Sequence, residues 1–190
     1  MSTSHLAVLG GKPEFEETLH VGRPNVGDRV RLAERFDEVL DRVWFTNNGP
    51  MVQKFEQTLA NRFAVRHVIA VCNATLGLEI ATRAAGVEGE VVVPSFTFVA
   101  TAHAIQWQGL TPVFADVVPS THLIDVDSVE SLITPRTTAI LGVHTWGVGC
   151  ETEALQRLAA RKGLTVMYDA AHAIGCTHRG SHCCGVAQAP

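Results

Sequence analysis

The 190-residue sequence contains no long apolar run, no excess of basic residues and no export signal. A helix that crosses a bilayer needs about 20 consecutive apolar residues, so we expect no membrane-spanning segment. The N-terminus lacks the basic and apolar regions of a secretory signal, which predicts a cytoplasmic protein. The formal net charge of -4 argues against a nucleic-acid partner, because such proteins carry basic surfaces.

Five cysteines are scattered along the chain, and this odd number argues against a disulfide framework. Near the C-terminal end Cys176, Cys183 and Cys184 are interleaved with His178 and His182. Zinc binds such side chains, but its usual sites use two separated pairs that flank a folded loop. We therefore favour an unstructured tail without a metal site, and keep zinc binding as the alternative.

Short apolar runs rich in β-branched residues alternate with helical segments from about residue 65 to 170. The runs predict strands at 67–71, 90–94, 112–116, 137–143 and 164–169. The segments between them predict helices at 75–85, 98–108, 125–133 and 151–162. This alternation is typical of right-handed βαβ units. We predict an α/β fold with a mostly parallel, doubly wound sheet in three layers.

The first 64 residues have a different pattern. Amphipathic helices are predicted at 28–43 and 51–63, with turn residues between them. We expect residues 1–64 to form a helical segment that packs on an α/β domain at 65–180. A divergent tail is expected at 181–190.

Helix ends carry their own signals. Pro50 suits the first position of the second helix, where its missing N–H has no partner to lose. Asp125 is placed to cap the helix at 125–133. Gly163 follows the helix at 151–162, at a position that favours a positive φ.

Residues at the carboxyl ends of the predicted strands are the candidates for ligand binding, because open α/β sheets bind ligands there. Thr75 begins a helix, whose free N–H groups and dipole favour a phosphate. Singly, Thr75 reads as a helix cap, Phe98 as core and His172 as an ordinary histidine. Asp169 differs, because a carboxylate that ends a buried strand needs a partner. Together these four would suit a flat, charged, phosphorylated cofactor.

Several sequence blocks resemble the DegT/DnrJ/EryC1/StrS sugar aminotransferases, which are fold-type I enzymes that depend on pyridoxal 5′-phosphate. The resemblance covers about residues 6–180 and includes TNNGPMVQKFEQTLA, HVIAVCNATLGLEIATRAAG, EVVVPSFTFVATAHAI and YDAAHAIG. Family members transfer an amino group, usually from glutamate, to a keto-sugar carried by a nucleotide. The resemblance therefore implies a transaminase with pyridoxal phosphate as cofactor, nucleotide-sugar and glutamate as substrates, and a homodimer.

The resemblance also implies roles for individual residues. Asp169 matches the acid that pairs with the pyridine nitrogen, and Phe98 matches the aromatic residue that stacks on the ring. Thr75 and Leu76 match the pair that binds the phosphate, and His172 matches a residue near the ring oxygen. A loop on the substrate side is matched by Trp44, Thr46 and Asn47.

The sequence departs from the family after Gly180. The family carries a lysine roughly 25 to 30 residues beyond the YDAAHAIG block, and this lysine forms a Schiff base with the cofactor. The three lysines of this chain all precede Asp169, at Lys12, Lys54 and Lys162. We expect a chain truncated before that lysine, with an incomplete large domain and no small C-terminal domain. Such a chain would bind the cofactor non-covalently at best and would be inactive; a non-catalytic binding or interaction subunit is the alternative.

Overall fold

The computed structural model describes residues 6–20 and 22–183. The chain divides into two compact units, Met1–Gly49 and Pro50–Pro190. The first unit contains a short 3₁₀ helix, η2 (Ala7–Leu9), and α1 (Arg29–Arg42). Asp28 caps α1, because its carboxylate accepts from the Val30 N–H at 2.9 Å.

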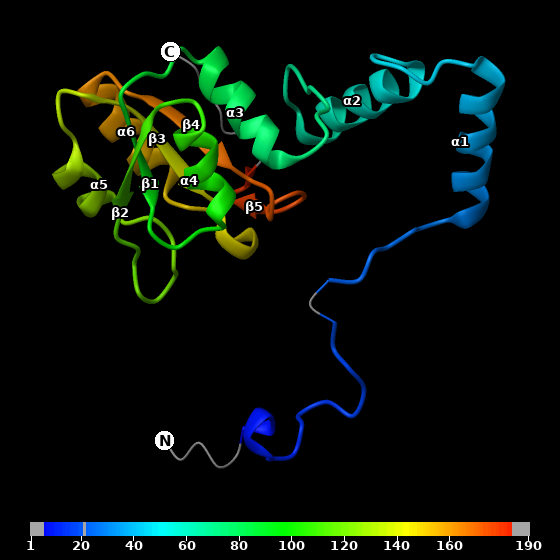
Figure 1. Cartoon of the computed structure of the whole chain (residues 1–190), viewed down its shortest axis with the longest axis horizontal. Coiled ribbons are helices and arrows are strands. Elements are labelled where there is room, and N and C mark those ends of the chain that lie inside the picture. The colour runs from blue at the N-terminus through cyan, green and yellow to red at the C-terminus, as the bar shows by residue number, and fades with distance from the viewer. Residues whose placement is uncertain (1–5, 21, 184–190) are drawn as a thin grey trace. The chain divides into compact units, whose positions relative to one another are not determined.

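The second unit has alternating helices and strands (Figure 1). Its helices are α2 (Pro50–Phe63), α3 (Ala74–Ala84), α4 (Val99–Gln106), α5 (Val126–Leu132), η3 (Thr145–Gly147) and α6 (Thr152–Lys162). Its strands are β1 (Glu90–Pro94), β2 (Thr111–Ala115), β3 (Thr137–Val143), β4 (Thr165–Asp169), β5 (Thr177–His178) and β6 (Ser181–His182). The division after Gly49 leaves α2 in the second unit, and the packing of residues 1–64 on the large domain stays a prediction.

A parallel sheet in the order β2-β1-β3-β4 forms the centre of the second unit. The central strands β1 and β3 are buried on both faces, because their side chains alternate between two cores, whereas the edge strands β2 and β4 are partly exposed. Val92 packs in one core with Leu155 of α6, whereas Val91 and Val93 pack in the other with Ile105 of α4. The predicted three-layer, parallel α/β fold is therefore confirmed.

The predicted helix ends are also confirmed. Pro50 is the first residue of α2. Asp125 caps α5 by accepting from the Asp127 N–H at 3.0 Å. Gly163 ends α6 with a φ of +69°, in the left-handed region that a residue without Cβ adopts at low cost.

The segment 67–71 is not a strand, so that prediction is wrong. Ile69 is 79% exposed, and the Ala70 N–H donates to Glu56 Oε1 of α2 at 2.8 Å instead of to a neighbouring strand. A strand is stable only where a second strand satisfies its backbone groups. Within the described residues β4 pairs with β3 alone, and no strand lies against residues 67–71. The β-branched composition of residues 67–71 is therefore not sufficient to make this segment a strand.

The predicted unstructured tail instead begins with a hairpin. Strands β5 and β6 pair in antiparallel fashion through a turn at Arg179 and Gly180, which have φ values of +49° and +83°. Two consecutive residues with positive φ are typical of the tight turns that join twisted strands. His182 contacts the ring of Phe63 edge-on, with ring centroids 5.3 Å apart, so the hairpin packs on the end of α2. The remainder of the predicted tail, 184–190, lies outside the described residues.

Two further sequence predictions concern absences. Among residues 6–20 and 22–183, no three His, Cys, Asp or Glu side chains come together in a way that could hold a metal ion. Cys184, which belongs to the zinc alternative, lies outside the described residues. In the same part of the chain, every helix is too short or too polar to cross a bilayer.

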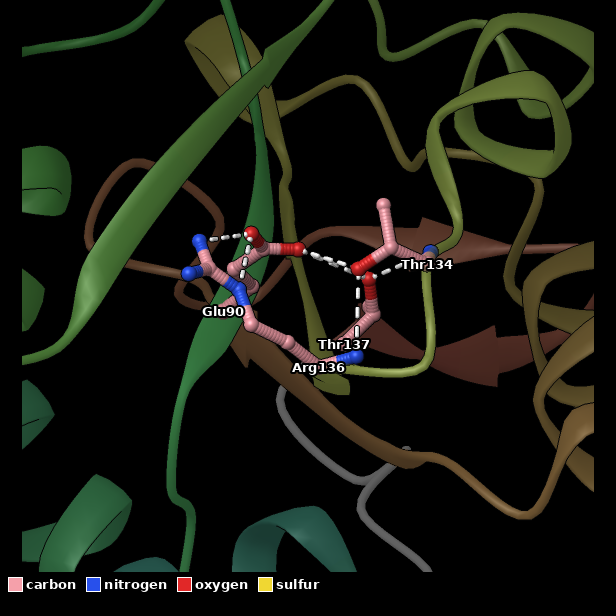
Figure 2. A network of polar contacts seen from close by, with 4 residues as sticks. All are labelled: Glu90, Thr134, Arg136 and Thr137. Atoms are coloured by element: carbon pink, nitrogen blue, oxygen red, sulfur yellow. Dashed lines mark hydrogen bonds and ion pairs between the residues drawn. The ribbon is translucent and has the colours of Figure 1, made fainter.

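Glu90 is buried at the start of β1 and joins it to the residues that precede and begin β3 (Figure 2). Its carboxylate accepts from the Thr134 hydroxyl at 2.6 Å, from Arg136 Nε at 2.9 Å and from the Thr137 hydroxyl at 3.4 Å. The bond from Thr134, followed by that from Arg136, lowers the pKa of Glu90 below its usual range. Gly89 has a φ of +64°, and a Cβ there would meet the Arg136 carbonyl oxygen at 2.5 Å.

Candidate functional site

A cavity of about 420 Å³ lies beyond the carboxyl ends of β1, β3 and β4. Its walls come from the loops that follow these strands and from the first turn of α3. Four of the predicted cofactor residues line it, namely Thr75, Phe98, Asp169 and His172. Residues that are far apart in the sequence thus meet at the edge of the sheet where parallel α/β folds bind ligands.

Asp169 is the last residue of β4, and two hydrogen bonds hold its carboxylate in place. Oδ2 accepts from the Thr101 hydroxyl at 3.1 Å, and Oδ1 accepts from the Ala171 N–H at 3.0 Å. These contacts supply the partners that the sequence argument required. Each carboxylate oxygen has two acceptor positions, so Asp169 can still accept from a cationic N–H inside the cavity.

The first turn of α3 is the candidate anion site. Asn73 caps this helix by accepting from the Leu76 N–H at 3.0 Å, so the cap is Asn73 and not Thr75. Leu76 is 40% exposed and is not part of the cavity wall, and its N–H is already engaged. The N–H groups of Ala74 and Thr75 have no acceptor within the helix, and the positive end of the helix dipole favours an anion beside them.

Phe98 offers a flat surface to the cavity. Its side chain is 71% exposed, so it is not the core residue that its apolar surroundings in the sequence suggested. A ring that lies open on a cavity wall can stack on a planar ligand. Phe96 and Trp146 also line the cavity and meet edge-on, with ring centroids 5.5 Å apart.

Two histidines also line the cavity but differ in their surroundings. His172 is exposed. His144 is 1% exposed and stacks on the Tyr168 ring at a centroid distance of 5.2 Å. Burial lowers the pKa of His144, and its Nδ1 accepts from the Cys150 N–H at 3.1 Å. His144 is therefore a neutral, structural histidine at neutral pH, which leaves His172 as the histidine that a ligand could reach.

Sequence reasoning missed Thr97 and Thr101. Thr97 precedes α4 and Thr101 lies in its first turn, and the two hydroxyl oxygens are 2.8 Å apart. The predicted substrate residues belong to the first unit. The cavity is lined by residues of the second unit, whereas the first unit contains Trp44, Thr46 and Asn47, whose role stays a prediction.

Comparison with known proteins identifies the family of this chain. The sequence matches the DegT/DnrJ/EryC1/StrS aminotransferase family over residues 28–190. This chain belongs to that family. A DegT-family relative, the dTDP-4-amino-4,6-dideoxy-D-glucose transaminase of Escherichia coli, is 40% identical over 165 residues, which are 87% of this chain and 44% of the relative.

Solved structures of similar proteins share the fold described above. DesI, solved in the presence of its TDP-sugar product, has a TM-score of 0.86 and 49% identity, and the match covers 96% of this chain and 46% of DesI. NtdA from Bacillus subtilis, solved with bound cofactor PMP, has a TM-score of 0.75 and 35% identity over 80% of this chain and 35% of NtdA. The chain thus spans less than half the length of the relatives it matches.

Proposed function

We propose that the cavity binds pyridoxal 5′-phosphate. One observation carries the proposal: an acid, an open aromatic ring and a helix N-terminus face the same cavity of about 420 Å³. Asp169 would accept from the protonated ring nitrogen, Phe98 would stack on the ring, and the first turn of α3 at Thr75 would bind the phosphate. When bound, pyridoxal phosphate supplies an electron sink for the carbon that carries the amino group.

We further propose that this chain provides the cofactor-binding part of an aminotransferase for nucleotide-linked keto-sugars, with glutamate as amino donor and a homodimer as the active form. The names of the relatives support the substrate class, because one acts on a dTDP-linked amino sugar and DesI was solved with a TDP-sugar product. The chain's own contribution would be to orient the ring at Asp169 and Phe98 and to anchor the phosphate at α3.

We expect no turnover from the 190-residue polypeptide alone. The three lysines lie at positions 12, 54 and 162, all before Asp169, whereas the family's covalent lysine follows that acid. The cofactor would then bind through the cavity contacts only. A non-catalytic binding or interaction subunit is the alternative, because the cavity contacts alone could hold the cofactor. The two differ in whether a full-length partner chain restores amination.

Binding of pyridoxamine 5′-phosphate tests the proposal, because this form lacks the aldehyde that reacts with surface lysines. A fluorescence titration of the chain should saturate at one ligand per chain. Asp169→Asn should weaken binding about 30-fold or more, because it removes a charge-assisted hydrogen bond worth about 2–3 kcal/mol. Asp127→Asn, in α5 and away from the cavity, is the matched control and should bind normally. Equal binding by both variants would contradict the assignment of the ring nitrogen to Asp169.

A further inference from the structure

Behind the cavity wall, two threonine hydroxyls lead to the Asp169 carboxylate. Thr97 lines the cavity just before α4, and Thr101 lies one turn further along in that helix. The Thr97 and Thr101 hydroxyl oxygens are 2.8 Å apart, and Thr101 Oγ1 is 3.1 Å from Asp169 Oδ2. Thr101 is 0% exposed, so water does not compete for its hydroxyl.

The direction of these hydrogen bonds follows from the number of protons. A hydroxyl has one proton to donate, and a carboxylate can only accept. The Thr101 proton is therefore directed at Asp169, and Thr97 must donate to Thr101. Hydrogen bonds arranged in such a series polarise one another, so the bond to the carboxylate is stronger than it would be from an isolated hydroxyl.

Both carboxylate oxygens of Asp169 are thereby fixed. The Ala171 N–H holds Oδ1 from the loop after β4, while Thr101 holds Oδ2 from a different element, α4. Rotation about the last side-chain bond of Asp169 would break both contacts. The strength of a charge-assisted hydrogen bond depends on its alignment, so the plane of this carboxylate determines how well it accepts from a ring nitrogen.

We propose that Thr101 is a positioning residue for the cofactor: its hydroxyl holds the Asp169 carboxylate in the orientation that meets the ring nitrogen, and Thr97 sets the direction of the Thr101 hydroxyl. The proposal rests on the proposed function of the cavity. A purely structural role would make Thr101 important for folding and equally important for every ligand of the cavity. A positioning role makes it important only for ligands that have the ring nitrogen.

The test compares two ligands and two substitutions at one position. Thr101→Val keeps the shape of the side chain and removes the hydroxyl, whereas Thr101→Ser keeps the hydroxyl. The ligands are pyridoxamine 5′-phosphate and its analogue in which the ring nitrogen is replaced by C–H. Thr101→Val should weaken binding of the first about three- to tenfold and leave binding of the second unchanged. Thr101→Ser should restore binding of the first to within about twofold of the wild type.

A second readout is the pH at which the ring nitrogen of the bound ligand loses its proton, followed by absorbance. Thr101→Val should lower this pH relative to wild type, because a misaligned carboxylate stabilises the protonated ring less. Should Thr101→Val fail to fold, Thr97→Val should show the same selectivity between the two ligands with a smaller loss.

The outcomes separate this inference from the proposed function. If the wild type binds pyridoxamine phosphate and Thr101→Val weakens both ligands equally, or neither, the positioning role is overturned while the cofactor site stands. If the wild type binds neither ligand, the proposed function is overturned and the positioning role with it.

Discussion

The two ends of the parallel sheet each carry an acidic residue in a hydrogen-bonded setting, and the two settings differ. At the amino end, the Glu90 carboxylate accepts from three side chains and is buried in the contact between β1 and the start of β3. At the carboxyl end, the Asp169 carboxylate accepts from one hydroxyl and one N–H and lies against a cavity. An acid whose acceptor positions are filled by the protein stabilises the fold. An acid that is held firmly but keeps acceptor positions open is suited to bind a ligand.

The largest expected effect is at the amino end. Gly89→Ala should lower the free energy of unfolding by about 3 kcal/mol or more, because a Cβ there combines a strained backbone with a clash. Gly109→Ala is the matched control: Gly109 has a φ of +79°, but a Cβ there would meet no atom within 4 Å. It should cost about 1 kcal/mol. Urea unfolding measures the stability of both variants. If both lose the same free energy of unfolding, the contact of the added Cβ with Arg136 is unimportant.

The next effect concerns Glu90 and depends on pH. The folded protein lowers the pKa of Glu90 from its ordinary value of 4.5, so the carboxylate stabilises the fold above that pH and less as the pH falls through the lowered pKa. Glu90→Gln should therefore lower the urea midpoint at pH 7, and its difference from wild type should shrink in acid. Glu153→Gln, at a side chain that is 58% exposed, should change little at either pH. A constant difference across the pH range would argue against a stabilising ionised Glu90.

The smallest expected effect is on ligand binding at the carboxyl end of the sheet, where a substitution of Phe98 should leave the stability of the fold unchanged. Phe98→Ala should weaken binding of pyridoxamine phosphate about two- to tenfold, because stacking between aromatic rings contributes about 0.5–1.5 kcal/mol. The side chain is 71% exposed, so the free energy of unfolding should change by less than about 0.5 kcal/mol. Phe98→Tyr keeps the ring and should retain the affinity. If Phe98→Ala lowered the stability but not the affinity, the carboxyl end of the sheet would serve the fold and not ligand binding, contrary to the comparison above.

The sequence predicted all four strands of the parallel sheet, each of which has a partner strand among the described residues. Strands β1 and β3 begin and end where their β-branched runs predicted, because both are central and buried on both faces. The run at 67–71 has the same composition but no partner among the described residues, and composition does not report whether a partner is present. The hairpin at 177–182 was missed because its turn depends on a positive φ at Arg179, which a non-glycine residue does not signal.

The candidate site was predictable where a residue follows a strand. Asp169 and Phe98 could be placed from the rule that ligands bind at the carboxyl ends of parallel strands. Thr101 could not be placed at the site from the sequence, because a threonine in an apolar helix gives no sign of which strand its hydroxyl faces. The assignment of the α3 cap to Thr75 was off by two positions, because Asn73 and Thr75 are both residues that cap helices.

The order of the strands also sets the width of the cavity. Phe98 lies in the loop after β1, Asp169 is the last residue of β4, and β3 runs between these two strands. Neighbouring strands lie about 4.8 Å apart, so the ends of β1 and β4 are separated by about 10 Å. Loop substitutions can change which groups line this opening, but its span follows from hydrogen-bond spacing in the backbone and would change only if a strand were gained or lost.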